Sequence, residues 1–516
     1  MEQTIKNKLL LLDDLIEKVK SLKQEGKVVV QTHGVFDLIH PGVIRHLNLS
    51  KKEGDVLIAT IIKDRDVRRG PDRPIFSEDS RIASVASLEQ VDFVCLVDDK
   101  KPFECVRRIN PDVFSKGQAL TERDRKTHKT LYEEKKELLF GKSRICETDV
   151  FPFNPSMVTY GLSVINNYLD IYSDVTKSFL QTFSEKYSFE EISKKIDKLE
   201  NLKVLLIGDG IIDEYHYCES MGKSPKAQLI VNKHLSQEVF PGGAFAIANH
   251  IASITKEVHL VTLLGNEDSR EDFILENLKP NVNTRFFYRD DGPTVIKKRY
   301  INQYQKQKLF EINYINDCYI NNGVEEGIIS YVKSVIDNYD LVLVSDFGHG
   351  FITNKLILEV ERLSKYLAVN AQSNGANSGY NLITKYNHPN FICLDTPEAR
   401  LATQDKFSEI ESVGKKLSKS LGTDNIMITM GKKGSICIKK NGDVIRVPGF
   451  STKVVDVIGA GDAFFSYAAP CFCVNMPIDM VSFIGNAAGA LDVQIVGNKK
   501  TVERGELLGF IHTILK

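Results

Sequence analysis

The 516-residue sequence has no long apolar run, no closely paired cysteine motif and a net charge of only −1. A membrane-spanning helix needs about 18 or more apolar residues in succession, so none is expected, and the charged amphipathic residues 1–26 do not resemble a signal peptide. The nine cysteines are scattered without a Cys-x-x-Cys pair, which argues against a zinc site or a disulfide framework. We therefore expect a cytoplasmic protein that has neither nucleic acid nor membrane as a partner.

The length of the chain exceeds what one hydrophobic core usually organises, and at about 150 residues per domain it predicts two or three units. We expect a first domain over residues 1–155, a helical linker over 156–200 and a larger domain over 201–516. The linker has little glycine or proline, and its apolar residues have helical spacing at Leu162, Ile165 and Leu169 and again at Phe189 and Ile192.

Continuous apolar runs predict buried parallel strands in both domains. They are 28–32 and 56–62 in the first domain, and 204–207, 258–263, 341–345, 391–394 and 426–429 in the second. Such runs are typical of sheets covered on both faces, so the expected fold class is α/β, with two doubly wound domains joined by helices. Ligands of such sheets bind at the carboxyl ends of strands, and the residues expected there are Asp37, His40, Asp209, Asp346 and Asp395.

The segment Asp456-Val-Ile-Gly-Ala-Gly-Asp462 precedes an apolar helical stretch. Backbone amides of Gly459, Ala460 and Gly461 at a helix start can hold a phosphoryl group. Asp462 can then take a proton from a sugar hydroxyl that attacks the γ-phosphate of ATP. Taken alone, the motif is as typical of a plain turn before a core helix, so the interpretation depends on its context.

Two upstream segments supply that context: a strand and turn over residues 204–213, and a glycine pair within residues 240–249. With the later motif they resemble the ribokinase-like (PfkB-type) sugar kinases over about residues 200–516. The resemblance implies ATP as phosphoryl donor, Mg²⁺ as cofactor and a possible homodimer through a lid sheet. The residues it implies are Asp213, Gly242 and Gly243 for the sugar, Thr429, Gly431 and Gly434 beneath the nucleotide, and Glu398 acting through water on Mg²⁺.

Within that family the segment 208–217, Ser224-Pro225 and Lys298-Arg-Tyr300 look most similar to heptose-phosphate kinases of lipopolysaccharide precursor synthesis. Lys298 is accordingly expected to contact the sugar. The chain departs from the family pattern at Ala246, Lys226 and His349, where Asn, Glu and Lys are usual. These departures leave the identity of the sugar open.

The N-terminal segment Gly34-Val-Phe-Asp-Leu-Ile-His40-Pro-Gly42-Val43 follows a predicted strand and opens a predicted helix. The ring of His40 would project toward an anion bound at the helix start, where it can neutralise the phosphates of a nucleoside triphosphate. A lone histidine in this place is more often a helix cap or a core residue. The surrounding pattern favours the functional interpretation.

That pattern resembles the cytidylyltransferase-like nucleotidyltransferases over about residues 25–150, and it continues through 69–74, Arg81, 91–92 and 110–117. The resemblance implies His40 as a catalytic residue and ATP or CTP as the nucleotide. Val43 stands where the family has a second histidine, and the family's Ser/Thr-rich motif has only residues 154–157 as a candidate. A hydrogen-bond donor of this kind, such as the missing histidine, typically contributes about 2.7–4 kcal/mol of transition-state stabilisation. The nucleotide-binding residues implied are Val35, Phe36, Asp37, Gly42, Arg81 and Lys116.

The two resemblances together predict a bifunctional enzyme for sugar activation. The C-terminal half would phosphorylate a sugar or sugar phosphate, and the N-terminal half would join a sugar 1-phosphate to a nucleotide. The chain resembles a bifunctional heptose kinase/nucleotidyltransferase with its domains in the opposite order. One alternative is a monofunctional kinase with a nucleotide-sensing or scaffolding N-terminal domain. A non-catalytic regulator is disfavoured by the intact Gly459–Asp462 motif.

Overall fold

The computed structural model describes residues 7–67, 70, 73–98, 104–117, 143–148, 171–375, 377–451 and 453–516. The chain divides into two compact units, Met1–Glu185 with Arg504–Lys516 and Lys186–Glu503. We expected one continuous domain from 201 to 516, but the C-terminal helix α20 (Arg504–Ile514) groups with the first unit. The described part of the expected linker holds α10 (Asp174–Lys186), α11 (Phe189–Asp197) and the 3₁₀ turn η2 (Lys198–Asn201).

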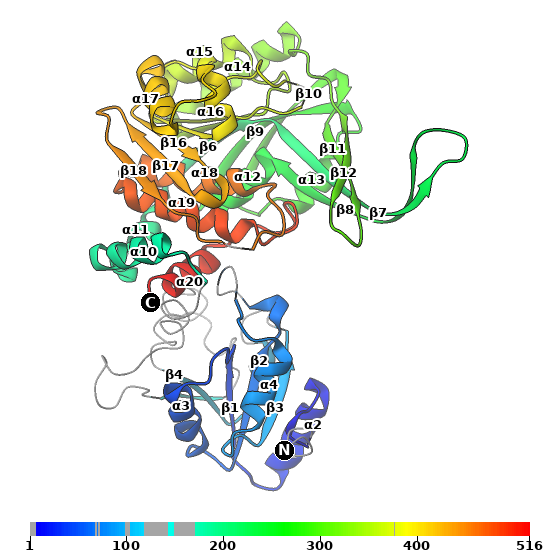
Figure 1. The fold of residues 1–516 in the computed structure, drawn as a ribbon, viewed down its shortest axis with the longest axis vertical. Coiled ribbons are helices and arrows are strands. Elements are labelled where there is room, and N and C mark those ends of the chain that lie inside the picture. The colour runs from blue at the N-terminus through cyan, green and yellow to red at the C-terminus, as the bar shows by residue number, and fades with distance from the viewer. Residues whose placement is uncertain are drawn as a thin grey trace. The chain divides into compact units, whose positions relative to one another are not determined.

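The first unit contains a five-stranded parallel sheet in the order β3-β2-β1-β4-β5 (Figure 1). Helices cover both faces, and each face has its own apolar core, as expected for a doubly wound domain. The strands are β1 (Val29–Gly34), β2 (Val56–Ile62), β3 (Phe93–Val97), β4 (Val113–Gly117) and β5 (Arg144–Thr148). The helices are α2 (Leu12–Gln24), α3 (Pro41–Lys51), α4 (Glu78–Ala86) and α5 (Glu104–Ile109), with the 3₁₀ turn η1 (Asp64–Asp66).

The second unit is built on a nine-stranded sheet in the order β10-β9-β6-β13-β14-β15-β16-β17-β18, parallel from β10 to β16 and antiparallel beyond. The predicted parallel strands are therefore confirmed. The bounds are β6 (Lys203–Gly208), β9 (Glu257–Glu267), β10 (Val282–Pro293), β13 (Leu341–Asp346), β14 (Leu367–Ala371), β15 (Phe391–Asp395), β16 (Asn425–Thr429), β17 (Ser435–Lys439) and β18 (Val444–Val447).

Helices cover both faces of this sheet. Figure 1 shows α14 (Asn322–Val335), α15 (Asn354–Leu363), α16 (Thr396–Thr403) and α17 (Ile410–Leu421) on one face. On the other face lie α12 (Ala244–Ala252), α18 (Ala460–Cys473) and α19 (Ile478–Asp492). The short helix α13 (Glu271–Asn277) and the 3₁₀ turns η3 (Ile336–Asn338), η4 (Ile383–Lys385) and η5 (Gly431–Lys433) complete the unit.

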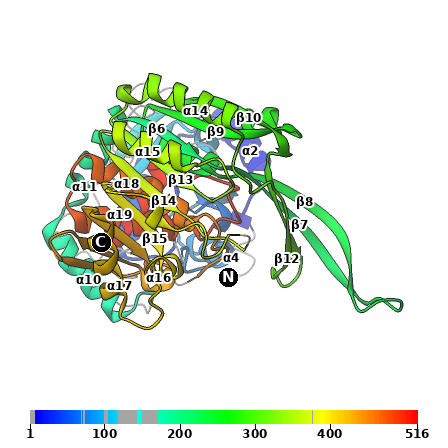
Figure 2. The ribbon, with the colours of Figure 1, turned by 90° about the horizontal axis from the view of Figure 1, so that it is seen from above.

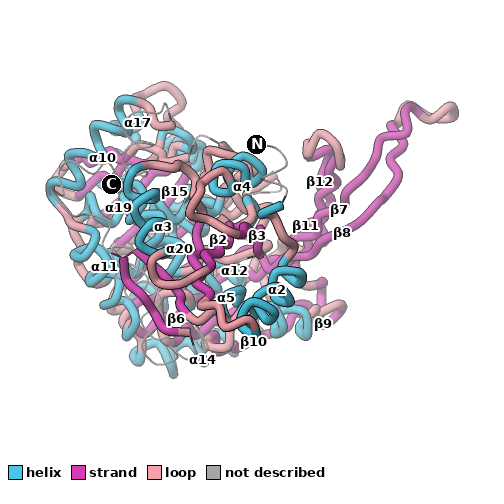
Figure 3. Tube along the Cα trace, turned by 90° about the horizontal axis from the view of Figure 1, so that it is seen from below, coloured by secondary structure: helices cyan, strands magenta, loops and turns pink. Residues whose placement is uncertain are grey.

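A separate four-stranded sheet, here called the lid sheet, extends from one side of the second unit (Figures 2 and 3). Its strands are β7 (Gly210–Lys223), β8 (Ile230–Gly243), β11 (Val295–Asn302) and β12 (Lys308–Tyr314), in the order β12-β11-β7-β8. The long hairpin of β7 and β8 projects away from the rest of the unit. The lid sheet follows β6 directly in the chain, because β6 ends at Gly208 and β7 begins at Gly210. The residues that come after β6, the first strand of the main sheet in the chain, therefore belong to the lid sheet.

In the described ranges no helix has the length and apolar character to cross a bilayer. All nine cysteines are free, and most are buried.

Candidate active sites

A cleft of about 1170 Å³ in the second unit lies between the lid sheet, the carboxyl ends of the central strands and the start of α18. This is the position expected for ligands of a doubly wound sheet. The structure brings most of the predicted residues of this half to one cleft. They are Asp213, Gly243, Glu398, Thr429, Gly431, Gly434, Gly459, Ala460, Gly461 and Asp462.

Asp462 lies in the first turn of α18 and is only 7% exposed. Its Oδ1 accepts a hydrogen bond of 2.5 Å from Gln372 Nε2. Burial raises the pKa of Asp462 to about 7, and the charge of the nearby Asp213 carboxylate contributes to this rise. The hydrogen bond from Gln372 and the charge of Lys297 lower this pKa, but they offset only part of the shift. The carboxyl group is therefore poised to accept a proton near neutral pH.

Gly459 is the N-cap of α18 and has φ 97°, a conformation that favours glycine. A side chain would also be excluded by its neighbours, because a Cβ atom would lie 2.6 Å from Asn498 Oδ1 and 2.8 Å from Asp492 Oδ2. By contrast, a Cβ atom at Gly461 would meet nothing within 4 Å. The motif thus combines a tightly packed entry with an open helix start that faces the cleft.

Asp213 projects into the cleft from β7 of the lid sheet. It forms an ion pair with Arg299 of β11, and Asn498 Nδ2 donates to its Oδ2 at 3.1 Å. Gly242 on the neighbouring strand lies against this carboxylate, since a Cβ atom there would overlap Asp213 Oδ2. We expected Gly242 to make room for a sugar, whereas in the structure it makes room for the side chain of Asp213.

Lys298 is placed differently from what we expected. It does not line the cleft, and its Nζ lies 3.2 Å from Glu214 Oε2 and 4.7 Å from the ring centre of Tyr314. Its neighbours Lys297 and Arg299 line the cleft instead. Asp213 pairs with Lys297 in the neighbouring strand, and side chains alternate between the two faces of a strand. Lys297 and Arg299 therefore lie on the same face as Asp213, and Lys298 lies on the other.

Lys297 is a buried ammonium group in this cleft, with Nζ 5.8 Å from the ring centre of Phe347. Burial lowers its pKa, although Asp213 opposes that shift. Within the described ranges no carboxylate forms an ion pair with Lys297. A buried cation without a paired anion suits a ligand that carries negative charge.

Glu398 lies on the wall of the cleft where α16 begins. It completes a capping box, because its Oε2 accepts from Asp395 N at 2.8 Å while Asp395 accepts from Glu398 N. Its Oε1 accepts from Ser373 N at 3.1 Å. Burial raises the pKa of Glu398 to about 7, and the charge of Asp395 adds to this shift.

Asp209 and Asp346 are buried and do not line the cleft. Asp346 pairs with Lys385 at 2.6 Å and accepts from Tyr386 Oη at 2.6 Å, while Asp209 accepts from Phe347 N at 2.8 Å. These contacts fix the loop after β13. His349 in that loop is buried, neither ring nitrogen has a hydrogen-bond partner in the described part of the chain, and burial lowers its pKa to about 3.

In the first unit His40 is the N-cap of α3, and its Nδ1 accepts from Gly42 N at 3.2 Å. His40 therefore caps the helix, which is a common role for a lone histidine at such a position. Because Nδ1 accepts, this geometry assigns the hydrogen of the neutral ring to Nε2, which leaves a donor on the opposite side of the ring. Burial lowers the pKa of His40 and favours this neutral form.

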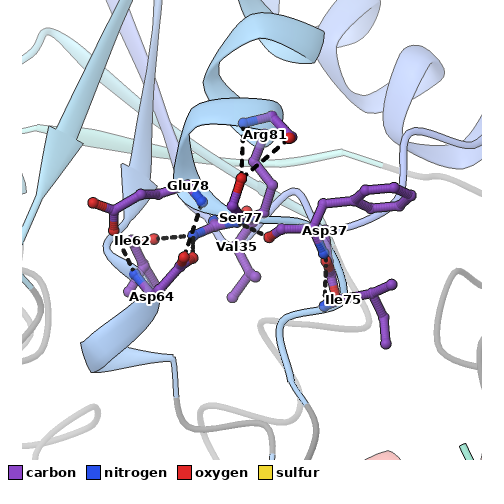
Figure 4. Close-up of polar contacts among 10 residues, drawn as sticks. Val35, Asp37, Ile62, Asp64, Ile75, Ser77, Glu78 and Arg81 are labelled. Carbon is purple, nitrogen blue, oxygen red and sulfur yellow. Dashed lines mark hydrogen bonds and ion pairs between the residues drawn. The ribbon is translucent and has the colours of Figure 1, made fainter. Parts of the chain in front are cut away.

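Arg81 was expected to offset phosphate charge, but the structure gives its guanidinium to protein acceptors (Figure 4). The side chain is buried. It donates to Val35 O at 2.5 Å, to Ile62 O at 2.8 Å and to Phe76 O at 3.1 Å, and it pairs with Asp64 Oδ1 at 2.6 Å. Arg81 therefore holds β1, β2 and α4 together, and the sequence could not reveal partners from three separate segments.

Asp37 has a similar structural role in the same loop region. Its carboxylate accepts from the backbone amides of Ile75 and Phe76 at 2.9 Å (Figure 4). Phe36 adopts φ 53°, and Val35 is buried. Lys116 at the end of β4 is also buried, with Nζ 5.9 Å from the ring centre of Phe114.

His46 is a polar residue of this region that no sequence motif indicated. Its Nε2 lies 2.7 Å from Thr32 Oγ1 and its Nδ1 lies 2.6 Å from Thr148 Oγ1, so the ring links the ends of β1 and β5. Burial lowers its pKa to about 4. Val43 packs against the apolar core of the unit. The proposed Ser/Thr-motif candidate at 154–157 lies outside the described residues.

The second unit is thus a doubly wound α/β domain that carries a lid sheet. Its cleft places a buried carboxylate beside a glycine-rich helix start, which is an arrangement typical of a phosphotransferase. Residues 201–503 match the pfkB family of carbohydrate kinases, and the chain belongs to that family. Residues 32–163 match the cytidylyltransferase-like family. Both predicted resemblances are confirmed.

Curated relatives include the bifunctional protein HldE of Trichlorobacter lovleyi, 23% identical over 324 residues that make up 62% of this chain and 65% of that protein. The HldE protein of Haemophilus influenzae is 25% identical over 319 residues, which cover 61% of this chain and 64% of the relative. The chain therefore spans slightly less than two thirds of the length of these relatives.

Among solved structures, Escherichia coli phosphofructokinase-2 in complex with potassium has a TM-score of 0.50 at 12% identity. The likeness covers 61% of this chain and 100% of that chain. At this identity it shows the fold alone.

Proposed function

We propose that this protein activates a sugar in two reactions: ATP-dependent phosphorylation in the second unit, and nucleotidyl transfer to a sugar 1-phosphate in the first. The observation that carries the proposal is the placement of Asp462 beside Gly459–Gly461 in one cleft with Asp213. The two family matches and the similarity to bifunctional HldE proteins support it.

In the proposed kinase step, Asp213 accepts hydrogen bonds from sugar hydroxyls, and the ion pair with Arg299 holds that carboxylate in place. The attacking hydroxyl gives its proton to Asp462 as its oxygen bonds to the γ-phosphorus of ATP. The bond from that phosphorus to the bridging oxygen breaks, and ADP leaves. Backbone amides of Gly459, Ala460 and Gly461 stabilise the charge on the transferred group.

Glu398 is the residue that we propose to hold Mg²⁺ through water, because it lines the cleft and each of its carboxylate oxygens accepts one backbone amide, which leaves a lone pair for a metal-bound water. When bound with ATP, Mg²⁺ neutralises phosphate charge. Thr429, Gly431 and Gly434 line the adjoining wall, where we place the nucleotide.

In the proposed transfer step, the Nε2–H group of His40 donates to the phosphates of ATP or CTP. A phosphate oxygen of the sugar 1-phosphate bonds to the α-phosphorus as pyrophosphate leaves. Gly42 and Lys116 are the remaining residues proposed for direct phosphate contact, whereas Val35, Phe36 and Asp37 shape the loop. Arg81 is left out because its donors are used within the domain.

We further propose a heptose-type sugar phosphate as the kinase substrate, in the synthesis of a cell-surface polysaccharide precursor in the cytosol. The motif resemblance supports the heptose, and the unpaired ammonium of Lys297 supports an acceptor that already carries a phosphate. A homodimer through the lid sheet is supported by a row of exposed apolar side chains on one face of β12, namely Phe310, Ile312 and Tyr314.

The test is to incubate the protein with ATP, Mg²⁺ and a panel of sugars and sugar phosphates, including heptose 7-phosphate, and to follow ADP. Sugar 1-phosphates with ATP or CTP are then supplied, and pyrophosphate is followed. Acceptor-dependent ADP and substrate-dependent pyrophosphate are the expected results. Absence of acceptor-dependent ADP across the panel would contradict the proposed kinase substrate class.

A monofunctional kinase is the second candidate. It is favoured by Val43, which packs against the apolar core at the position where the family has a second histidine, and by the engagement of Arg81 with protein acceptors. Its expected result is ADP formation with no pyrophosphate from any matched sugar 1-phosphate and nucleotide.

A further inference from the structure

Asp456 lies three residues before Gly459, in the connection between β18 and α18. Its carboxylate contacts two strands of the lid sheet: Lys308 Nζ of β12 lies 2.6 Å from Oδ1, and Tyr215 Oη of β7 donates to Oδ2 at 2.7 Å. It also accepts from Gly497 N at 3.0 Å and from Ile458 N at 3.2 Å. One side chain thus joins the lid sheet to the loop that leads into the glycine motif.

The Asp456 and Tyr215 side of this junction is buried, whereas the Lys308 side chain reaches it from the surface and is 37% exposed. Asp456 is 8% exposed and Tyr215 is fully buried, with its ring edge-on to Phe240 at 5.4 Å between centres. Burial alone would raise the pKa of Asp456, but the Lys308 ion pair and the Tyr215 hydrogen bond lower it. A buried carboxylate that receives charge-assisted bonds holds its partners in a defined geometry, and loss of Lys308 would leave Asp456 without its paired cation.

The residues after Gly497 extend the same junction. Asn498 Nδ2 donates to Asp213, and Lys499 forms an ion pair with Glu238 of β8. Asn498 also packs against Gly459, as the space around that glycine shows. The sugar-facing side of the lid sheet and the phosphoryl-facing helix start are therefore connected through one short loop and one carboxylate.

We propose that Asp456 is a positioning residue, and that its contacts with Lys308 and Tyr215 act as a latch that aligns the lid sheet with Gly459–Gly461. The proposal rests on the kinase function proposed above. With the latch closed, a hydroxyl bound at Asp213 meets a correctly placed phosphoryl site and water is kept out. With the latch broken, transfer to the acceptor slows, and water can attack the γ-phosphorus in its place, giving ADP and phosphate.

The experiment compares Lys308→Met with the conservative Lys308→Arg in the full chain, and with Lys306→Met as the matched control. Lys306 is a nearby lid residue whose Nζ lies over the ring of Tyr217 and not at Asp456. A misplacement of about 1 Å can lower a rate by about a hundredfold. We expect Lys308→Met to lower kcat by about tenfold to a hundredfold and to produce more ADP than phosphorylated acceptor, while the KM for ATP stays within about twofold. Lys308→Arg should recover most of the coupling.

A second readout needs no acceptor. Amide hydrogen exchange is measured with Mg²⁺ and a non-hydrolysable ATP analogue, and Lys308→Met should speed exchange both in β12 and in residues 455–462. Exchange that changes in β12 alone, or kinetics of Lys308→Met equal to those of Lys306→Met, would overturn the latch. Turnover of the wild-type protein separately tests the kinase function, so the two failures are distinguishable.

Discussion

Asp462 Oδ1 and Gln372 Nε2 are joined by a hydrogen bond of 2.5 Å inside the cleft. Gln372 is itself held by Asn370, whose Oδ1 accepts from the same amide nitrogen at 2.9 Å. This single amide donor does not compensate for the burial of the Asp462 carboxylate, and the pKa of Asp462 is raised to about 7 as a result. Two measurable consequences concern this carboxyl group.

The first is the pH dependence of the kinase reaction. A base must be deprotonated to accept a proton, so kcat/KM for the acceptor should rise with pH, pass a midpoint near 7 and level off above it. The measurement is initial-rate ADP formation from pH 5.5 to 9 at constant ionic strength. A profile that is level from pH 5.5 to 7.5 would contradict the raised pKa.

The second consequence is an opposite effect of Asp462→Asn on activity and stability. Loss of the base should lower turnover by about 10²–10⁴-fold. The folded-state pKa is above its unfolded value of 3.8, so the charged carboxylate destabilises the fold increasingly as pH rises from about 4 to 7. At pH 8 the variant should therefore be more stable, by at most about 4 kcal/mol for a shift of about three units.

Thermal unfolding of the wild type and Asp462→Asn at pH 5 and pH 8 checks this. The melting temperature of the variant should exceed that of the wild type clearly at pH 8 and much less at pH 5. An equal or lower melting temperature at pH 8 would show that the carboxylate is stabilised by interactions that these contacts do not include.

Two adjacent lysines on β11 provide a matched pair of substitutions. Lys297→Met removes a charge from the cleft, whereas Lys298→Met removes the same charge from the opposite face of the lid sheet. A hydrogen bond to a charged group contributes about 1.5–3 kcal/mol, so Lys297→Met should raise the KM for a phosphorylated acceptor by about 10–150-fold. Lys298→Met should change it by less than about twofold, because its partner Glu214 lies outside the cleft.

Steady-state kinetics with a sugar phosphate and with the unphosphorylated sugar separate the two lysines. The difference between the variants should be large for the phosphorylated acceptor and small for the free sugar. Equal effects of the two substitutions would remove the support that Lys297 gives to a phosphate-bearing substrate.

The two roles of His40 can be separated by the choice of replacement. Asparagine is a good N-cap and can keep the start of α3, but it lacks the Nε2–H donor on the far side of the ring. His40→Asn should therefore lower pyrophosphate release by about 10²–10³-fold with little loss of stability. His40→Ala should lose activity and also about 1 kcal/mol of stability.

Pyrophosphate release and thermal unfolding of both variants are the measurements. Kinase turnover in the second unit serves as the internal control. If His40→Asn released pyrophosphate as fast as the wild type, His40 would be a helix cap only.

The sequence by itself was sufficient to predict the features that depend only on residues close together in the chain. Continuous apolar runs predicted the parallel strands, and the segment from Gly459 to Asp462 predicted a glycine-rich helix start with a carboxylate in its first turn. These features are local, because backbone conformation and side-chain direction within one turn follow from a few consecutive residues. The two family resemblances rest on the same kind of contiguous motif and are confirmed.

Only the tertiary structure decided which residues of distant segments meet. Strand pairing turned Lys297 rather than Lys298 toward Asp213, and three segments used the donors of Arg81. Asp456 meets Lys308 and Tyr215, which lie 148 and 241 positions away in the chain. Such contacts depend on strand register and on how the lid sheet packs, and these are set by the summed burial of many side chains, which a short motif does not contain.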